Sequence, residues 1–332
     1  MEQRELGRSG ILVSAIGLGC NNFGLFPDAE QATACVHAAL DAGITFFDMA
    51  SEHGAGIEEE LVGRALRGRR DEAVLATKVG QAELYKIRQD GTAQFSTDTL
   101  RSGLSRRWIM RSVEESLTRL GTDHIDLYQP HVYDSDVSRA ETIEALNDLV
   151  QQGKVRAIGD AATAASVDQL IATSALTQAN EWTPLSSMQA RYNLLDRRVE
   201  SELVPELQRR QMSLIPYMPL ANGMLTGKYA RRDVYPAGSR MERLATIRGM
   251  ITDQEWRMAD AVKQFAADRD LNPTHVAISW LLARPTVTTV IAGASRPEQI
   301  RENVAAADIK ISHDDLADLD RLTAQLANIN TP

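Results

Sequence analysis

Apolar runs of strand length alternate with amphipathic stretches of helix length along almost the whole chain. The apolar runs predict buried strands at residues 15–20, 44–48, 73–79, 125–131, 155–159, 186–192, 213–218 and 288–293. Helical spacing of apolar residues predicts helices near 28–42, 58–66, 108–120, 140–152, 167–176, 199–211, 253–267, 273–283, 298–305 and 313–326. A short run at 11–13 follows an Arg-Ser-Gly turn and could begin a hairpin.

This alternation, with no linker-like break, predicts a (β/α)8 TIM barrel that occupies residues 1–332 as a single α/β domain. A doubly wound sheet is the alternative fold. A glycine-rich phosphate turn directly after the first strand would favour that sheet. The segment Gly17-Leu18-Gly19-Cys20-Asn21-Asn22 lacks the third glycine of that turn, so the barrel is preferred.

Two connections are longer than a barrel requires. Residues 80–106 are polar and rich in Gly, Ser and Thr, and residues 221–248 form a second long loop. Loops of this length in a compact domain are usually functional. We expect the first of them to line a substrate pocket together with residues 132–134 and the C-terminal tail.

Composition and charge narrow the class of protein. Hydrophobic content of 43% and charged content of 24% are ordinary for a soluble globular protein. A net charge of −9 and a pI near 5.3 argue against a nucleic-acid partner. Cys20 and Cys35 have no metal-ligand spacing and are expected to be free, buried thiols. Without a signal peptide or membrane-length apolar run, the sequence predicts a cytoplasmic protein with a small-molecule substrate.

Three titratable residues lie at the ends of three predicted strands. They are Asp48, Lys78 and His131, each at the carboxyl end of an apolar run. A barrel brings these ends to one face, where active sites are built. Asp48 would neutralise a buried Lys78, Lys78 would lower the pKa of a nearby proton donor, and His131 would donate a hydrogen bond to a substrate oxygen.

Several motifs, in order, resemble the aldo-keto reductase superfamily along nearly the whole chain. The matching segments are 17–20, 47–54, 76–78, 121–131, 189–193, 219–229 and 293–299. The resemblance implies a (β/α)8 barrel that binds NADP(H) and transfers hydride to or from a carbonyl carbon. It also implies a catalytic tetrad of Asp, Tyr, Lys and His, of which Asp48, Lys78 and His131 are present.

The fourth position departs from the family, because His53 stands where relatives have the proton-donating tyrosine. The reference pKa is about 10 for Tyr and about 6.5 for His. We expect the Lys78 cation to lower the pKa of His53 further, so that the imidazole is neutral near pH 7. Either His53 replaces the tyrosine as acid and base, or it serves a different substrate geometry or proton transfer.

The resemblance also implies a cofactor site. Its residues would be Gly19, Cys20, Gln189, Tyr217, Pro219, Leu220, Gly223, Lys228, Gly293, Ser295, Arg296, Gln299 and Asn303. Among them Tyr217 would stack on the nicotinamide, and Arg296 at a helix N-terminus would suit the 2′-phosphate of NADP. Ala161 and Ala162 stand where the family usually has a Ser-Asn pair for the carboxamide, which leaves Gln189 for that role.

Three functions are compatible with these residues. The first is an NADP(H)-dependent oxidoreductase that acts on a carbonyl or alcohol with an altered tetrad and no metal. The second is a redox-neutral lyase or isomerase on the same barrel, with His53 and His131 as acid and base. The third is a catalytically silent nucleotide-binding or regulatory protein, as some relatives of the family are.

Overall fold

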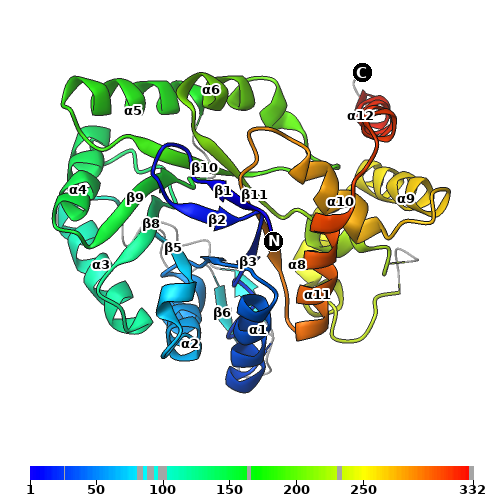
Figure 1. The fold of residues 1–332 in the computed structure, drawn as a ribbon, viewed down its shortest axis with the longest axis horizontal. Helices are drawn as coiled ribbons and strands as arrows, with labels where there is room; N and C mark the ends of the chain where they lie inside the picture. Colours follow the sequence, from blue (N-terminus) through cyan, green and yellow to red (C-terminus); the bar gives the residue numbers. More distant parts are fainter. Residues whose placement is uncertain are drawn as a thin grey trace.

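Parallel strands form a nearly closed barrel at the centre of the molecule (Figure 1). The computed structural model describes residues 1–25, 27–80, 85–87, 93–95, 103–162, 166–229 and 234–328. Within these residues, an eight-stranded parallel sheet runs in the order β11-β10-β9-β8-β5-β4-β3-β12. Backbone hydrogen bonds from Leu214 to Thr286 and from Thr288 to Leu214 join its two edges. The predicted (β/α)8 barrel is confirmed.

The barrel strands are β3 (Ile16–Gly19), β4 (Phe46–Asp48), β5 (Val74–Val79), β8 (Ile125–Pro130), β9 (Val155–Asp160), β10 (Leu185–Arg191), β11 (Ser213–Tyr217) and β12 (Val290–Gly293). Two hairpins lie outside the barrel sheet: β1 (Gln3–Glu5) with β2 (Leu12–Ser14), and β6 (Tyr85–Ile87) with β7 (Ala93–Phe95). In Figure 1 the first hairpin lies across one end of the barrel.

Helices surround the strands as an outer layer (Figure 1). The α-helices are α1 (Ala29–Asp41), α2 (Ile57–Ala65), α3 (Arg106–Leu120), α4 (Arg139–Gln151), α5 (Val167–Ala179), α6 (Leu203–Arg210), α7 (Arg240–Arg243), α8 (Ala245–Met250), α9 (Asp253–Ala267), α10 (Pro273–Leu282), α11 (Pro297–Ala305) and α12 (His313–Asn328). The short 3₁₀ segments are η1 (His53–Gly56), η2 (Arg70–Glu72), η3 (Arg198–Glu200), η4 (Ala221–Thr226) and η5 (Ala306–Asp308). Among the described residues, no helix is long and apolar enough to cross a membrane.

Side-chain caps explain where several helices begin. Asp28 caps α1, and its carboxylate and the Gln31 side chain form a reciprocal capping box. Ser105 caps α3 in the same position relative to its helix, so that α3 begins at Arg106, two residues before the predicted start at 108. Gly121 ends α3 with a left-handed backbone, φ 64°. Local capping chemistry therefore sets these boundaries.

The barrel interior has its own apolar core, filled from one end by the β1–β2 hairpin. Its buried residues are Leu6, Ile11, Val13, Phe46, Ala76, Leu127, Ala157, Ile215 and Ile291. Side chains two positions apart on a strand share a face. Asp48 and Lys78, two residues after Phe46 and Ala76, therefore also point into the barrel, one layer above this core.

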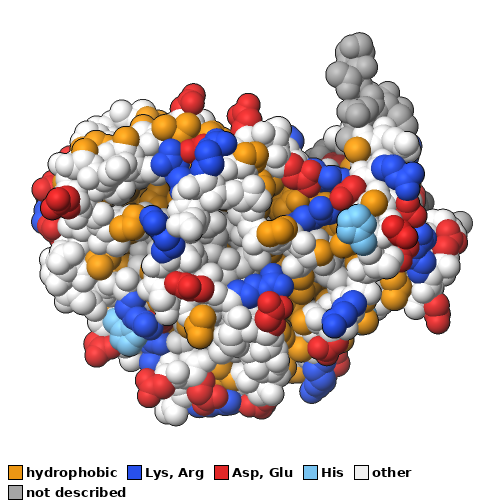
Figure 2. Space-filling view, turned by 45° about the horizontal axis from the view of Figure 1, so that its top comes forward, with side chains coloured by type: hydrophobic (Ala, Val, Ile, Leu, Met, Phe, Trp, Pro, Cys, Tyr) orange, Lys and Arg blue, Asp and Glu red, His pale blue; other side chains and the backbone are white. Residues whose placement is uncertain are grey.

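The two long connections contain more structure than expected. Residues 80–106 include the β6–β7 hairpin, while 81–84, 88–92 and 96–102 lie outside the described residues, as does the tail 329–332. Residues 221–248 contain η4, α7 and the start of α8. On the molecular face in Figure 2, acidic and basic side chains are intermingled.

Candidate active site

A buried ion pair lies at the carboxyl ends of β4 and β5. The Lys78 ammonium is 2.8 Å from Asp48 Oδ2 and donates a second hydrogen bond of 2.6 Å to the carbonyl oxygen of Met49. The Lys78 side chain is 2% exposed and that of Asp48 is 8% exposed. A buried ammonium is tolerated only with such partners. The predicted pairing of Asp48 with Lys78 is thus present in the structure.

Gln189 reaches the same carboxylate from β10, on the other side of the barrel. Its Nε2 donates a 2.8 Å hydrogen bond to Asp48 Oδ1, and the residue is buried. Asp48 therefore holds side chains from two distant strands and sets their relative position. The role of Gln189 toward a carboxamide stays a prediction, and its Nε2 already has this partner.

A tight turn places His53 next to the ion pair. After β4 the chain enters η1, in which Gly54, Ala55 and Gly56 have left-handed φ values of 58°, 55° and 92°. This run turns the chain back on itself, so that α2 begins directly beside His53. A Cβ at Gly56 would lie 2.5 Å from the Arg119 side chain, so both the space and the backbone favour glycine there.

His53 is paired with a buried carboxylate from the first turn of α2. Its Nδ1 lies 2.5 Å from Glu58 Oε2, and the two side chains are 8% and 0% exposed. Burial alone would lower the pKa of His53, but the negative charge of Glu58 and the hydrogen bond to it raise the pKa above its usual value. The expectation that the pKa of His53 would be lowered is therefore wrong. Lys78 does act in that direction, but Glu58 outweighs it.

The pKa of Glu58 is raised as well, although its carboxylate is paired with an imidazole. Burial raises its pKa to about 7, although the neighbouring His53 opposes the rise. Its second oxygen, Oε1, is buried and has no hydrogen-bond partner within the described part of the chain. Glu58 and His53 therefore share a proton, and the pKa of each lies above its ordinary value.

A second imidazole–carboxylate pair lies next to the first. Glu52 accepts a hydrogen bond from Nδ1 of His131, which directly follows β8. Burial raises the pKa of Glu52, but the positive charge of His131 and this hydrogen bond hold it at about 2. The rings of His53 and His131 meet edge to face, with centroids 6.0 Å apart. The structure thus brings the four predicted catalytic residues to one end of the barrel.

Sequence reasoning missed both carboxylates. Glu52 precedes His53 in a loop, and Glu58 belongs to a Glu58-Glu59-Glu60 run that resembles a solvated helix start. Two residues of that run are nevertheless fully buried. The one available signal was the acidic density beside a candidate histidine, and the helical period alone does not show which glutamates are buried.

Cations converge at the far end of the predicted cofactor site. Burial lowers the pKa of Lys228, and the positive charges of Arg296 and Arg240 lower it further. Arg240, on α7, also donates a 2.8 Å hydrogen bond to Asn22 Oδ1. A group of neighbouring cations of this kind is suited to a polyanionic ligand such as the phosphates of a dinucleotide. Arg240 was not predicted, because α7 lies in the long second loop.

The start of α11 completes this end of the site. Arg296 is the N-terminal cap position, and Ser295 donates from its backbone N and its hydroxyl to Gln299 Oε1, at 2.8 and 3.1 Å. Asn303 is buried one turn further along the helix. Helix N-termini favour anions because their backbone N–H groups and dipole point outward.

The turn after β11 forms a cradle beside Lys228. Tyr217 ends the strand and is partly buried, and Pro219 and Leu220 lead into η4. Gly223 has φ 89°, and a Cβ there would lie 2.9 Å from both Cε and Nζ of Lys228. The positive φ favours glycine there, and the lysine lies close against this backbone, so the residues present fit a phosphate-bearing cofactor.

The remaining predicted positions lie at the ends of β3, β9 and β12. Cys20 follows β3, and its backbone N–H donates to the carbonyl of Asp48 at 2.9 Å. Burial raises the pKa of the Cys20 thiol well above its usual value, and the charges of Glu58 and Asp48 add to the effect. Gly19 and Gly293 are aligned on β3 and β12.

Ala161 and Ala162, after β9, are buried and offer no side-chain hydrogen bond. The backbone N–H of Ala162 instead donates to Asp160 Oδ1 at 2.9 Å. Asp160 is in turn paired with Arg139 of α4. At Ala161 and Ala162 the backbone is therefore held by Asp160, which is itself held by Arg139.

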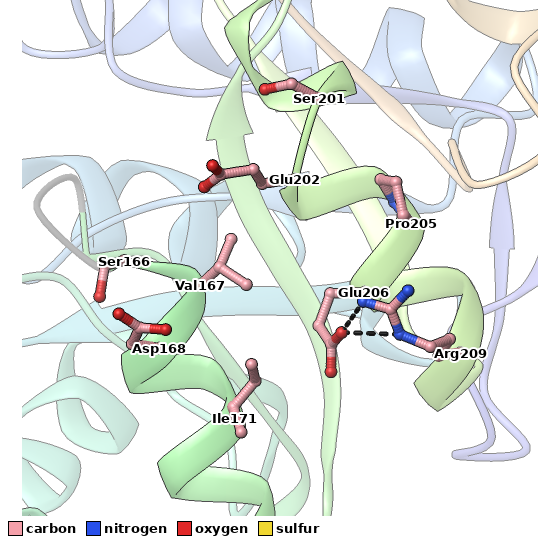
Figure 3. Close-up of a pocket in the computed structure, with 9 residues that line it drawn as sticks. All are labelled: Ser166, Val167, Asp168, Ile171, Ser201, Glu202, Pro205, Glu206 and Arg209. Atoms are coloured by element: carbon pink, nitrogen blue, oxygen red, sulfur yellow. Dashed lines mark hydrogen bonds and ion pairs between the residues drawn. The ribbon is translucent and has the colours of Figure 1, made fainter.

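A surface groove between α5 and α6 is separate from these residues (Figure 3). It is lined by Ser166, Val167, Asp168, Ile171, Ser201, Glu202, Pro205, Glu206 and Arg209. Within the groove, Glu206 accepts a hydrogen bond from Arg209 at 2.8 Å. The groove lies in the outer helical layer and contains none of the titratable residues at the barrel end.

Comparisons with known proteins agree with this geometry. The family model "Aldo/keto reductase family" matches residues 15–324. L-glyceraldehyde 3-phosphate reductase of Escherichia coli K12 is 34% identical over 97% of this chain and 92% of its own. Versiconal hemiacetal acetate reductase of Aspergillus parasiticus is 31% identical over 95% of each chain. The solved structure of aldo-keto reductase AKR11C1 from Bacillus halodurans (holo form) superposes with a TM-score of 0.75 and 29% identity, over 97% of this chain and 96% of that one.

Proposed function

Because the chain belongs to the aldo/keto reductase family and is an oxidoreductase of that family, we propose that it interconverts a carbonyl compound and an alcohol with NADP(H). In this proposal His53 takes the place of the family's tyrosine as proton donor and acceptor. The observation that supports it is the convergence of Asp48, Lys78, His53 and His131 at one end of the barrel.

The ion pair supplies fixed positive charge near the reacting oxygen. Lys78 is anchored by Asp48 and by the carbonyl of Met49, so its ammonium has little freedom to reorganise. A preorganised cation stabilises negative charge that develops on a carbonyl oxygen during reduction. His131, oriented through Nδ1 by Glu52, would offer its other ring nitrogen to the same oxygen.

His53 would complete the reaction by moving one proton. During reduction the substrate oxygen takes a proton from His53, and during alcohol oxidation His53 takes it back. Because Nδ1 faces Glu58, the atom that exchanges the proton with substrate is Nε2. A positioned acid–base group of this kind contributes about 10²- to 10⁴-fold to the rate.

When bound, NADP(H) supplies or accepts the hydride. Arg296, Lys228 and Arg240 would hold its phosphates, and the cation at Arg296 is the basis for proposing NADP(H) over NAD(H). The other residues proposed to line the cofactor are Gly19, Cys20, Gln189, Tyr217, Pro219, Leu220, Gly223, Gly293, Ser295, Gln299 and Asn303.

The test is loss of NADPH absorbance with a panel of aldehydes and ketones, and its gain from NADP⁺ with the matching alcohols. We expect turnover with at least one pair, and a loss of about 10²-fold or more in kcat for Lys78→Met and for His53→Asn. Conversion of a carbonyl substrate with constant NADPH absorbance would instead support a redox-neutral enzyme. NADPH binding, seen as fluorescence quenching, without any turnover would support a silent nucleotide-binding protein. Either result would refute the oxidoreductase proposal.

A further inference from the structure

We infer that Glu58 is a positioning residue that keeps His53 protonated on Nδ1 and charged, so that the proton donor of this barrel is a carboxylate–imidazole pair and not a single side chain. The inference rests on the proposed function for its role in catalysis. The pairing itself can be tested separately.

The geometry fixes which nitrogen does what. Glu58 lies in the first turn of α2, and the left-handed turn through η1 brings His53 back to within 2.5 Å of its Oε2. A carboxylate at that distance accepts a proton from Nδ1, as in the carboxylate–histidine pairs that fix a ring tautomer. The ring is then held in one orientation, and Nε2 is the nitrogen proposed to exchange a proton with a substrate.

Charged groups from each neighbouring element act on His53. Glu58 on α2 and Glu52 before η1 raise its pKa, and Lys78 on β5 lowers it. Asp48 on β4 is occupied by Lys78, and His131 after β8 is occupied by Glu52. The backbone of β6 also packs against η1, and its side chains lie outside the described residues.

Counting charges at the barrel end supports the same assignment. Asp48 is paired with Lys78, and Glu52 accepts a hydrogen bond from His131. Glu58 is fully buried, and His53 is the group within ion-pair distance of it among the described side chains. An ionised carboxylate without a counter-charge is costly in such a setting, so Glu58 and His53 share one proton between them.

The next residue, Glu59, is a natural comparison. It is as buried as Glu58 but points to a different network, accepting from Thr77 Oγ1 at 2.6 Å and from Arg119 Nε at 2.6 Å. Two adjacent glutamates with equal burial therefore have different partners. Only Glu58 contacts the imidazole, so Glu59→Gln is a matched control for Glu58→Gln.

The experiment is an NMR titration of the whole protein labelled with ¹⁵N- and ¹³C-histidine, with His53 assigned by comparison with His53→Asn. We expect ¹⁵N shifts that show Nδ1 protonated throughout the titration. We also expect the pKa of His53 to fall by about one pH unit or more in Glu58→Gln, because the opposite charge is lost while burial remains. It should move little in Glu59→Gln and recover in part in Glu58→Asp.

An Nε2-protonated neutral tautomer with a bare Nδ1 in the wild type would overturn the inference. So would an unchanged His53 pKa in a folded Glu58→Gln protein, or an equal fall in Glu59→Gln. The wild-type tautomer decides the matter even if Glu58→Gln does not fold. A confirmed pairing in a protein that never oxidises NADPH would refute the proposed function alone, whereas turnover with an unpaired His53 would refute this inference alone.

Discussion

Replacing Asp48 by Asn tests whether the buried ion pair organises the barrel end. The substitution leaves the shape nearly unchanged but removes the charge that Lys78 faces at 2.8 Å. The ammonium keeps only its hydrogen bond to the Met49 carbonyl, in a site where the lysine is 2% exposed. The side-chain oxygen of Asn can still accept a hydrogen bond from Gln189. Most of the lost stability therefore comes from the unpaired charge of Lys78.

Breaking a buried pair by removing one partner costs about 3–5 kcal/mol, because the other charge remains buried. We therefore expect Asp48→Asn to lower the free energy of unfolding by about 3 kcal/mol or more. Removing both charges is far less costly. The free energy of unfolding of the double variant Asp48→Asn with Lys78→Met should lie within about 1 kcal/mol of the wild-type value, although the variant lacks the cation proposed for catalysis.

Urea unfolding followed by circular dichroism measures these free energies, with the m-value as a check that the transition is unchanged. The exposed pair of Arg111 and Glu115, 2.7 Å apart on α3, supplies a control. Glu115→Gln should cost less than about 0.5 kcal/mol. The reasoning is refuted if Asp48→Asn costs no more than that control, or if the double variant is as unstable as the single one.

Three further predictions concern the surrounding groups. Folding lowers the pKa of Glu52 from 4.5 to about 2, so Glu52 contributes about 3 kcal/mol of stability above pH 4.5, which is lost as the pH falls toward 2. Glu52→Gln should therefore be less stable than the wild type at pH 7 and indistinguishable near pH 2 in urea titrations; a constant difference would contradict this. Arg296→Gln should weaken NADPH binding about tenfold or more while leaving NADH binding nearly unchanged. Fluorescence quenching measures both affinities. Equal losses for both cofactors would refute a contact between Arg296 and the 2′-phosphate. His53→Tyr alone should lower stability at pH 7, and adding Glu58→Gln should restore it in thermal unfolding; a stable single variant would show that Glu58 does not depend on the imidazole.

The barrel and the inward placement of Asp48 and Lys78 could be predicted from sequence, because both depend on short-range periodicity. Phe46 and Asp48, like Ala76 and Lys78, are two residues apart on a strand and so share its inward face. The parallel pairing places Asp48 beside Ala76, so Lys78 lies one inward position further along β5, where its ammonium meets the Asp48 carboxylate. The family resemblance added His53, whose ring meets that of His131 in the structure, while its role stays a prediction.

The rest of the site depends on backbone turns that periodicity does not describe. Glu58 meets His53 only because three consecutive left-handed residues, one of them Ala55, turn the chain between them. Arg240 reaches Asn22 from a short helix inside a segment expected to be a loop. The error in the predicted pKa of His53 has the same origin, since a contact that the sequence does not reveal determines its sign.

Asp48, Glu52 and Glu58 are buried carboxylates beside the proposed catalytic residues, and their partners constrain what position 53 can be. Lys78 is paired with Asp48 and His131 with Glu52, so neither can serve Glu58 without being released from its partner. A tyrosine at 53 could donate a hydrogen bond to Glu58 but could not balance its charge. The carboxyl would then have to be protonated, and it would no longer orient the residue that exchanges a proton with substrate. The inferred roles of residues 53 and 58 therefore depend on each other, and a change at either position should be tested together with the other.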